Sequence, residues 1–141
     1  METPVITVAD FKKRLIDLCL RSGLTDFPVK RRDQLILLQS IAVGFDSAKT
    51  YSETEINAGI REWLDRLGCF PGWDHLMLRR RLIDEGLLSR TRDGSRYRVE
   101  PASPSGIAFD PAIAGLDVFG ALEEGRESIV RKKEEYLRQS G

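Results

Sequence analysis

The sequence has few of the residues from which metal sites and disulfide frameworks are built. Its 141 residues include a single histidine, His75, and two cysteines, Cys19 and Cys69, which lie far apart and form no CxxC motif. This spacing disfavours a zinc site and a disulfide, so we expect no metal and no cofactor. We expect both thiols to act as small apolar core residues. We expect His75 to be a core or capping residue, not a ligand or a base.

The sequence also lacks long apolar segments and catalytic motifs. No run approaches the roughly 18 apolar residues that a membrane-spanning helix needs, and residues 1–10 lack the basic and apolar regions of a secretory signal. We therefore expect a cytoplasmic protein without a membrane contact. No glycine-rich phosphate loop, G-x-S-x-G motif or pair of metal-ligand motifs occurs, so we expect no enzyme and no catalytic residue.

The formal net charge is zero, because 22 basic side chains balance 22 acidic ones. A neutral total counts against a non-specific nucleic-acid binder, which is usually basic. The charges are nevertheless segregated along the chain. Between Trp73 and Val99 seven arginines accompany four acidic residues, and residues 101–141 carry a small acidic excess.

Apolar residues recur at helical spacing in four stretches, and most ends of these stretches carry a capping signal. Thr7 begins the first stretch, and Ser52 with Glu55 forms an S-x-x-E capping box before the third. Gly23, Gly68 and Gly86 follow the ends of the first, third and fourth. The predicted helices span about 7–23, 30–45, 52–68 and 74–85.

Two strands are predicted to follow the fourth helix, at about 87–92 and 95–99. They are joined at Asp93-Gly94, a dipeptide that favours a two-residue type I′ hairpin turn. Lys49–Tyr51 is predicted to form a short extended segment before the third helix. The order helix, strand, helix, helix, hairpin is that of a winged helix-turn-helix, in which the hairpin is the wing.

The predicted fold class is therefore mostly α with a small β-hairpin wing, with extra helices at both ends. We divide the chain into an N-terminal helix (1–26), a winged-helix domain (27–100), a linker (101–113) and a C-terminal amphipathic helix (114–141). Phe119, Leu122, Ile129 and Tyr136 give this last helix an apolar seam that needs a partner. The partner is either the rest of the protomer or a second copy of the chain, so a homodimer through the terminal helices is possible.

A helical wheel divides the residues of the fourth helix between a buried arc and an outward face. Leu76, Leu82 and Ile83 bound the buried arc, and His75 and Arg79 fall inside it. A buried charge persists only when it is paired, so we expect Arg79 to pair with a carboxylate, that of Glu55 on the preceding helix. The outward face carries Trp73, Met77, Arg80, Arg81 and Asp84.

The outward arginines are candidates for DNA contacts, since Arg is the favoured reader of guanine and a common phosphate ligand. The wing adds four more, which we expect on one face of the hairpin, opposite Leu88, Tyr97 and Val99. The alternative is that these arginines are simply solvated. Asp84 would repel a phosphate backbone. The DNA-contact candidates are Arg80, Arg81, Arg90, Arg92, Arg96, Arg98, Lys49 and Ser52.

Four motifs occur in order between Phe27 and Val99. They are Phe27-Pro28-Val29-Lys30, the segment 51–57 (YSETEIN), the segment 74–90 (DHLMLRRRLIDEGLLSR), and Asp93-Gly94 followed by Tyr97. This set resembles a bacterial family of winged-helix domains of unknown function, family 2087. The resemblance implies a winged-helix fold and a family often joined to transcriptional-regulator domains. It implies no ligand, target or catalytic residue.

Two functions fit these features better than a third, an enzyme or a small-molecule carrier. The first is a DNA-binding transcriptional regulator that contacts double-stranded DNA with the fourth helix and the arginine-rich wing. The second is a protein-interaction module without DNA affinity, which the neutral net charge and the outward Trp73, Met77 and Asp84 favour.

Overall fold

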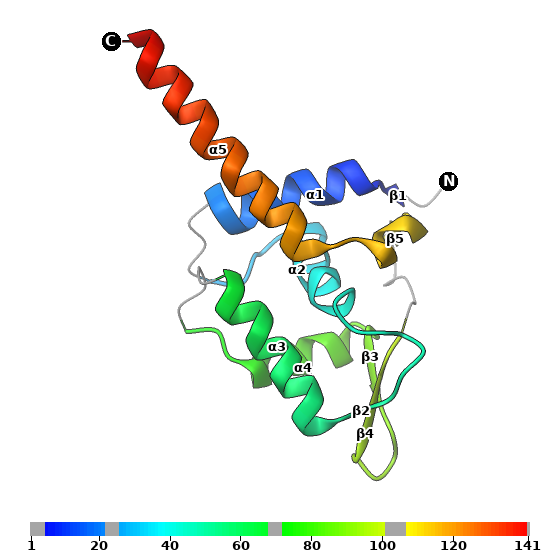
Figure 1. Ribbon diagram of the computed structural model, residues 1–141. Coiled ribbons are helices and arrows are strands. Elements are labelled where there is room, and N and C mark those ends of the chain that lie inside the picture. Colours follow the sequence, from blue (N-terminus) through cyan, green and yellow to red (C-terminus); the bar gives the residue numbers. More distant parts are fainter. Residues whose placement is uncertain (1–4, 22–25, 68–71, 101–106, 141) are drawn as a thin grey trace.

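The computed structural model describes residues 5–21, 26–67, 72–100 and 107–140 (Figure 1). Two short helical turns accompany the α-helices: the π-helical η1 (Asp17–Arg21) continues α1, and the 3-10 helix η2 (Pro111–Gly115) precedes α5. The α-helices are α1 (Val8–Ile16), α2 (Arg31–Ala42), α3 (Glu53–Leu67), α4 (His75–Asp84) and α5 (Val118–Ser140). The strands are β1 (Val5–Ile6), β2 (Tyr51–Ser52), β3 (Leu88–Arg90), β4 (Arg96–Val99) and β5 (Ala108–Phe109).

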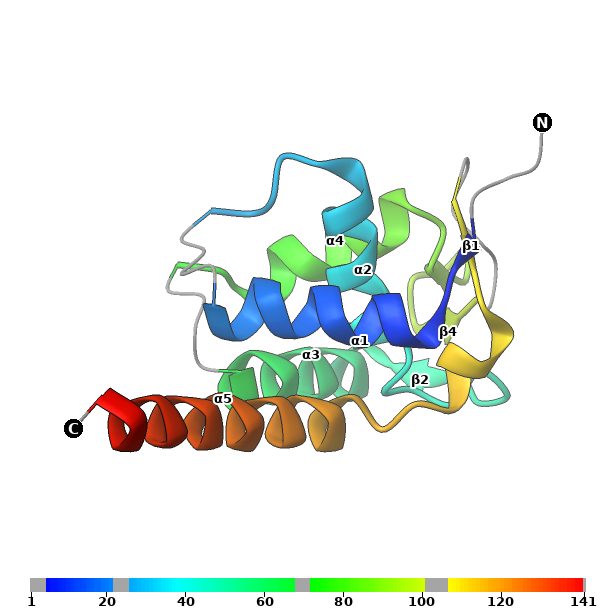
Figure 2. The ribbon, with the colours of Figure 1, turned by 90° about the horizontal axis from the view of Figure 1, so that it is seen from above.

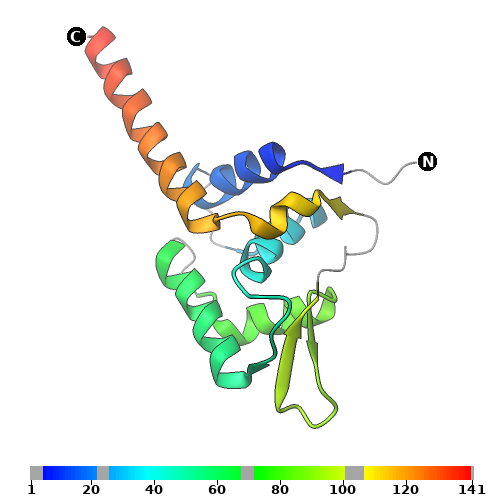
Figure 3. The same ribbon diagram turned by 45° about the vertical axis from the view of Figure 1, so that its right-hand side comes forward.

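The central part of the chain is a winged helix-turn-helix. Strands β2, β4 and β3 form an antiparallel sheet in that order, and α3 and α4 follow β2 directly. The β3–β4 hairpin extends from the body as the wing (Figure 3). The predicted fold class, mostly α with a small β wing and extra terminal helices, is confirmed.

Local capping explains where several helices begin and end. The Thr7 hydroxyl accepts a hydrogen bond from the Asp10 amide at 3.1 Å, and Asp74 accepts one from the Met77 amide at 2.8 Å. Gly86, with φ of 76°, ends α4 in a left-handed turn of the kind that glycine favours. The predicted ends at Gly23 and Gly68 lie outside the described residues, as does Cys69.

Helix α2 is the centre of the core, because it is buried on nearly every side. Its buried residues are not confined to one stripe: Leu35, Ile36, Leu37 and Leu38 are all at most 1% exposed. The helix ends at Ala42, three residues before the predicted end at Phe45, which is half-buried beyond it. A helix buried all round lies between other elements, here between α1 on one side and α4 on the other.

Two polar side chains of α2 are buried, and both have partners. Asp33 accepts two hydrogen bonds from the Arg14 guanidinium of α1, at 2.8 and 2.9 Å. Ser40 accepts a hydrogen bond of 3.0 Å from Trp63 Nε1 of α3. These contacts fix α1 and α3 on α2, since a buried polar group without a partner is costly.

The turn of the wing differs from the predicted type I′ turn. Among the described residues only glycines have positive φ, so Asp93 does not adopt the conformation that a type I′ turn requires. Instead the Gly94 amide donates to the Thr91 carbonyl at 2.9 Å, and the Thr91 amide donates to the Arg96 carbonyl at 3.0 Å. The loop therefore has four residues, 92–95, and the prediction of a two-residue loop was wrong.

Part of the predicted linker 101–113 is built into the fold. Strand β5 pairs in parallel with β1, Phe109 packs edge-on against Phe11, and Ile113 of η2 is fully buried. Residues 107–113 are therefore not a linker, and their apolar side chains explain why they pack. Residues 101–106 lie outside the described residues.

Helix α5 is anchored on the body only in its first half. It begins at Val118, later than the predicted start at 114, and Gly125 lies where a Cβ would come within 2.8 Å of Ile16. Leu122 is buried and Ile129 is half-buried, whereas residues 130–139 are all exposed. Figures 1 and 2 show the helix crossing the body beside α1 and then extending past it. Within the described part of the chain, no helix has the length and apolarity needed to cross a bilayer.

The buried Asp33 carboxylate gives stability a pH dependence. Its hydrogen bonds from Arg14 lower the pKa of Asp33 below its usual range, so the ionised form favours the fold. We expect Asp33→Asn to reduce the free energy of unfolding by about 1–3 kcal/mol at pH 7. The stabilisation is present above the pKa of the unfolded carboxyl, about 4, and is lost as the pH falls through the lower folded pKa.

Urea unfolding of both proteins between pH 7 and pH 3 measures this dependence. The difference between wild type and Asp33→Asn should shrink below about pH 4. A difference that stays constant over the whole range would contradict the assignment.

Candidate nucleic-acid interface

Three residues of α4 are exposed, and they lie one turn apart. They are Leu76, Arg80 and Asp84, and the other residues of the helix are buried or half-buried. Leu78 and Leu82 attach the opposite face to the core. The wheel placed Leu76 at the edge of the buried arc, but it is 53% exposed, so this prediction was wrong. The buried stripe of α4 is narrow and ends before it reaches this side chain. We call Leu76, Arg80 and Asp84 the outward stripe.

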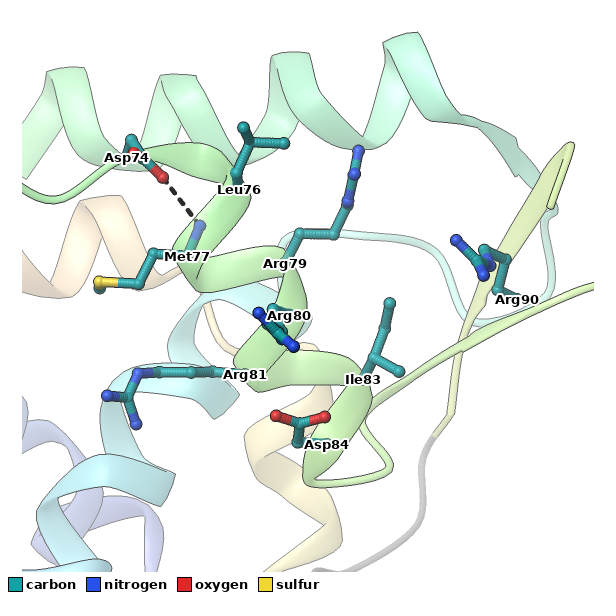
Figure 4. A pocket seen from close by; sticks show the side chains of 9 residues that line it. All are labelled: Asp74, Leu76, Met77, Arg79, Arg80, Arg81, Ile83, Asp84 and Arg90. Carbon is teal, nitrogen blue, oxygen red and sulfur yellow. Dashed lines mark hydrogen bonds between the residues drawn. The ribbon is translucent and has the colours of Figure 1, made fainter.

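The outward stripe lines an open groove that also receives Arg90 from the wing (Figure 4). Figure 4 shows Arg79 pointing up toward α3, Arg81 pointing to the other side of α4, and Arg80 between them. Arg80 and Arg90 are both exposed, and neither has an ion pair within the described residues. The groove therefore offers two guanidiniums whose donors are available to a ligand.

Arg79 is a structural residue that joins three elements. Its Nη1 donates to Glu53 Oε1 at 3.0 Å and to Asn57 Oδ1 at 2.8 Å, both on α3. Its guanidinium also lies 5.8 Å from the ring centre of Tyr97 on β4. The predicted pairing of Arg79 with a carboxylate is confirmed, and it fixes α4 against α3 and the wing.

The predicted partner of Arg79, Glu55, was wrong. Glu55 Oε1 instead accepts a hydrogen bond from the Ser52 amide at 3.0 Å, and the Glu55 amide donates to Ser52 Oγ at 3.2 Å. This is the predicted capping box, and its hydrogen bonds lower the pKa of Glu55. Glu53 and Asn57 were missed, although their i, i+4 spacing places them on one face of α3 and Glu55 on another.

Arg81 has an aromatic partner, which distinguishes it from Arg80. Its guanidinium lies 4.0 Å from the centre of the Phe27 ring, a cation–π contact, and Phe27 packs against Trp73 with ring centres 5.4 Å apart. No pattern in the sequence indicates this contact, because Phe27 lies far from α4 along the chain and outside its helical periodicity. Arg81 and the half-buried Trp73 thus belong to the packing that holds α4 on the segment before α2.

The wing arginines lie on both faces of the hairpin, whereas the sequence predicted that they share one face. The register pairs Leu88 with Val99, Ser89 with Arg98 and Arg90 with Tyr97, and paired side chains lie on the same side of a sheet. Arg90 is therefore on the face of Tyr97 and Leu88, next to α4, because residues 88 and 90 have the same parity.

Arg96 and Arg98 point to the other face of the wing, and Arg92 is exposed in the loop. Arg98 Nε lies 3.5 Å from the Ser47 carbonyl. Lys49 is exposed nearby, and its charge and that of Arg96 contribute to the lowered pKa of Glu55. The hydroxyl of Ser52 accepts the capping bond of Glu55, so this candidate serves α3 rather than the surface.

The loop of the wing is held by the carboxylate of Asp93. It accepts hydrogen bonds from Thr91 Oγ1 at 2.7 Å, the Ser95 amide at 3.0 Å and Ser95 Oγ at 2.8 Å. These bonds lower the pKa of Asp93 to about 2, so the carboxylate is ionised at neutral pH. All three bonds are accepted by Oδ1, and neither Arg92 nor Arg96 forms an ion pair with a described residue.

Among the described residues, His75 and Cys19 belong to no cluster of metal-ligating side chains. His75 is half-buried at the start of α4, with Nε2 3.3 Å from the Arg61 guanidinium, and the free Cys19 is buried. Across the residues that the structure describes, no group of three or more histidine, cysteine, aspartate or glutamate side chains lies close enough to hold a metal ion.

The chain has the strand order β2-β4-β3, the helix pair α3 and α4, and the hairpin wing that together define a winged-helix protein. The sequence profile of a bacterial family of uncharacterized conserved proteins, DUF2087, matches residues 23–99, more than half of the chain. The chain therefore belongs to this family. No curated protein and no solved structure matches it.

A double-mutant cycle tests the junction at Arg79. We expect Arg79→Ala and Glu53→Ala to be coupled by about 0.5–1 kcal/mol, because their charges are in contact and Glu53 is partly exposed. The matched cycle of Arg79→Ala with Glu55→Ala should show no coupling. Thermal unfolding of the variants measures both energies, and equal coupling in the two cycles would refute the assignment.

Proposed function

We propose that this protein is a winged-helix transcriptional regulator that binds double-stranded DNA with α4 and the wing. The observation that carries the proposal is the open groove that Arg80 and Arg90 both line, neither of them in an ion pair with a described residue. Guanidiniums with free donors suit the phosphates and guanine edges of a duplex. In a helix-turn-helix of this type, the second helix of the motif lies in the major groove.

The wing supplies the second set of contacts. Arg92 at its tip and Arg96 and Arg98 on its outer face are exposed, and Lys49 lies on the same side of the molecule. These cations suit the phosphates that flank the major-groove contact, or a minor groove. The proposal excludes Arg79 from the contact surface, because its Nη1 donates to Glu53 and Asn57 of α3 and its side chain is only 16% exposed.

The acidic residues near this surface are mostly engaged within the protein. Glu53 is paired with Arg79, Glu55 caps α3 and Asp93 holds the wing loop. The neutral total charge therefore coexists with a face on which free cations outnumber free carboxylates. This excess of free cations favours a moderate affinity for DNA that depends strongly on the salt concentration.

A second candidate function is a protein-interaction module, and α5 favours it. The exposed second half of this helix carries Val130, Tyr136 and Leu137, which are 50%, 70% and 59% exposed. Apolar side chains on a projecting helix suit a protein partner or a second copy of the chain. Figures 1 and 3 show this part of α5 on the side of the molecule away from the wing, so such a contact would not compete with DNA. A homodimer through the terminal helices remains a prediction, and the DNA contacts above do not require it.

Fluorescence anisotropy with a random-sequence duplex tests the DNA proposal. We expect affinity to fall on the order of 10³-fold between about 50 and 200 mM salt, as roughly six phosphate contacts require. Replacing both groove arginines in Arg80→Ala/Arg90→Ala should weaken binding at least about tenfold at the lower salt.

The control Arg131→Ala/Lys132→Ala removes the same charge from the projecting part of α5. It should bind DNA nearly as well as wild type. If the wild-type titration is flat at both salt concentrations, or if both double variants lose affinity equally, DNA binding by this face is refuted. A flat titration favours the interaction module, for which Val130→Ala/Tyr136→Ala on the exposed half of α5 is expected to reduce partner binding.

A further inference from the structure

The outward stripe presents three different chemistries at regular spacing. Leu76 is apolar, Arg80 is a donor with a permanent positive charge, and Asp84 is an acceptor with a negative charge. All three line the same groove and are the exposed residues of α4. A surface that only bound phosphates would gain nothing from an exposed carboxylate, since a carboxylate repels them.

Arg80 and Asp84 have the i, i+4 spacing at which a helix commonly forms an ion pair, yet no ion pair joins them. Their polar atoms are thus available to a ligand separately. Other i, i+4 pairs of this chain do interact, as Arg66 and Glu62 show with a distance of 3.3 Å.

The helix that carries the stripe is fixed at both ends and in the middle. Asp74 caps its first turn, Arg79 ties its centre to α3, and Glu85 just after its end accepts two hydrogen bonds from Arg31 of α2, at 3.1 and 2.9 Å. A helix held in this way presents its outward side chains in a defined position. Such rigidity is what the reading of individual bases requires.

We propose that the outward stripe reads base edges in the major groove, and that it selects thymine with Leu76, guanine with Arg80 and cytosine with Asp84. The inference rests on the proposed DNA binding. An apolar side chain contacts the thymine methyl, Arg donates to guanine O6 and N7, and a carboxylate accepts from the cytosine N4 amino group. Asp84 then contributes specificity, and it lowers affinity for sequences that place no amino group opposite it.

The spacing of the stripe sets the size of the site. Residues four apart on a helix rise by about 6 Å, which is close to two base steps of about 3.4 Å. The three residues therefore address bases about two positions apart, within roughly five base pairs. The ligand class is a short duplex site that contains both a guanine and a cytosine contact.

Selection of bound duplexes from a randomised pool, followed by sequencing, tests the inference on the full chain. Wild type should enrich a site with one guanine and one cytosine position. Asp84→Asn should change the cytosine position to adenine, because an amide pairs with adenine N6 and N7. Arg80→Ala should abolish the guanine preference and leave the cytosine preference in place.

Two further variants make the outcome decisive. Asp84→Ala should lose the cytosine preference without gaining adenine, and it covers the case in which Asp84→Asn fails to fold, which circular dichroism detects. Asp65→Asn on α3 removes the same charge from another exposed site and should leave the profile unchanged.

The outcomes separate this inference from the proposed function. If wild type binds duplexes and Asp84→Asn or Asp84→Ala binds all sequences more tightly with the same base profile, Asp84 only repels phosphates and the inference is wrong, while DNA binding stands. If wild type retains no duplex at low salt, both are wrong. A change confined to the predicted position supports the stripe.

Discussion

The contact of Arg79 with Glu53 and Asn57 is the constraint on which the surface of this protein depends. It joins α4 to α3, and the same guanidinium lies against Tyr97 of the wing. Arg79 directly precedes Arg80 in α4, and consecutive helical residues point in different directions. Because the Arg79 side chain is held toward α3, the Arg80 side chain points outward. This structural arginine thus helps to set which side of α4 faces the groove.

The remaining polar contacts distribute the charges in a similar way. Three nearby carboxylates, those of Glu55, Asp93 and Glu53, are used for a helix cap, a loop and an ion pair. In the groove itself, Arg80, Arg90 and Asp84 form no ion pair with a described residue. A chain with no net charge can thus present a cationic face. The buried helix α2 supports this arrangement through the Arg14–Asp33 and Trp63–Ser40 contacts, which attach α1 and α3 to a common core.

Much of the fold could be predicted from the sequence because its signals are local. Each of these signals acts within one helical turn, and the order of elements follows from them. They include the capping box of Ser52 and Glu55, the cap at Thr7 and the glycine at position 86. Several of the errors concern contacts between distant segments or strand parity. Arg79 pairs with Glu53 and not with the predicted Glu55. Arg81 lies over the ring of Phe27. The strand register places Arg90 on the opposite face of the wing from Arg96. Ala108 and Phe109 pair with the N-terminal strand, which no local pattern indicates.

A titration of the ¹⁵N-labelled protein with a short duplex, followed by backbone amide NMR, tests whether α4 and the wing bind DNA. If they do, the largest shifts fall on α4, β3 and the wing loop, with little change in the exposed half of α5. Shifts confined to α5, or no shifts at low salt and excess duplex, would contradict the claim that α4 and the wing form a DNA-binding face.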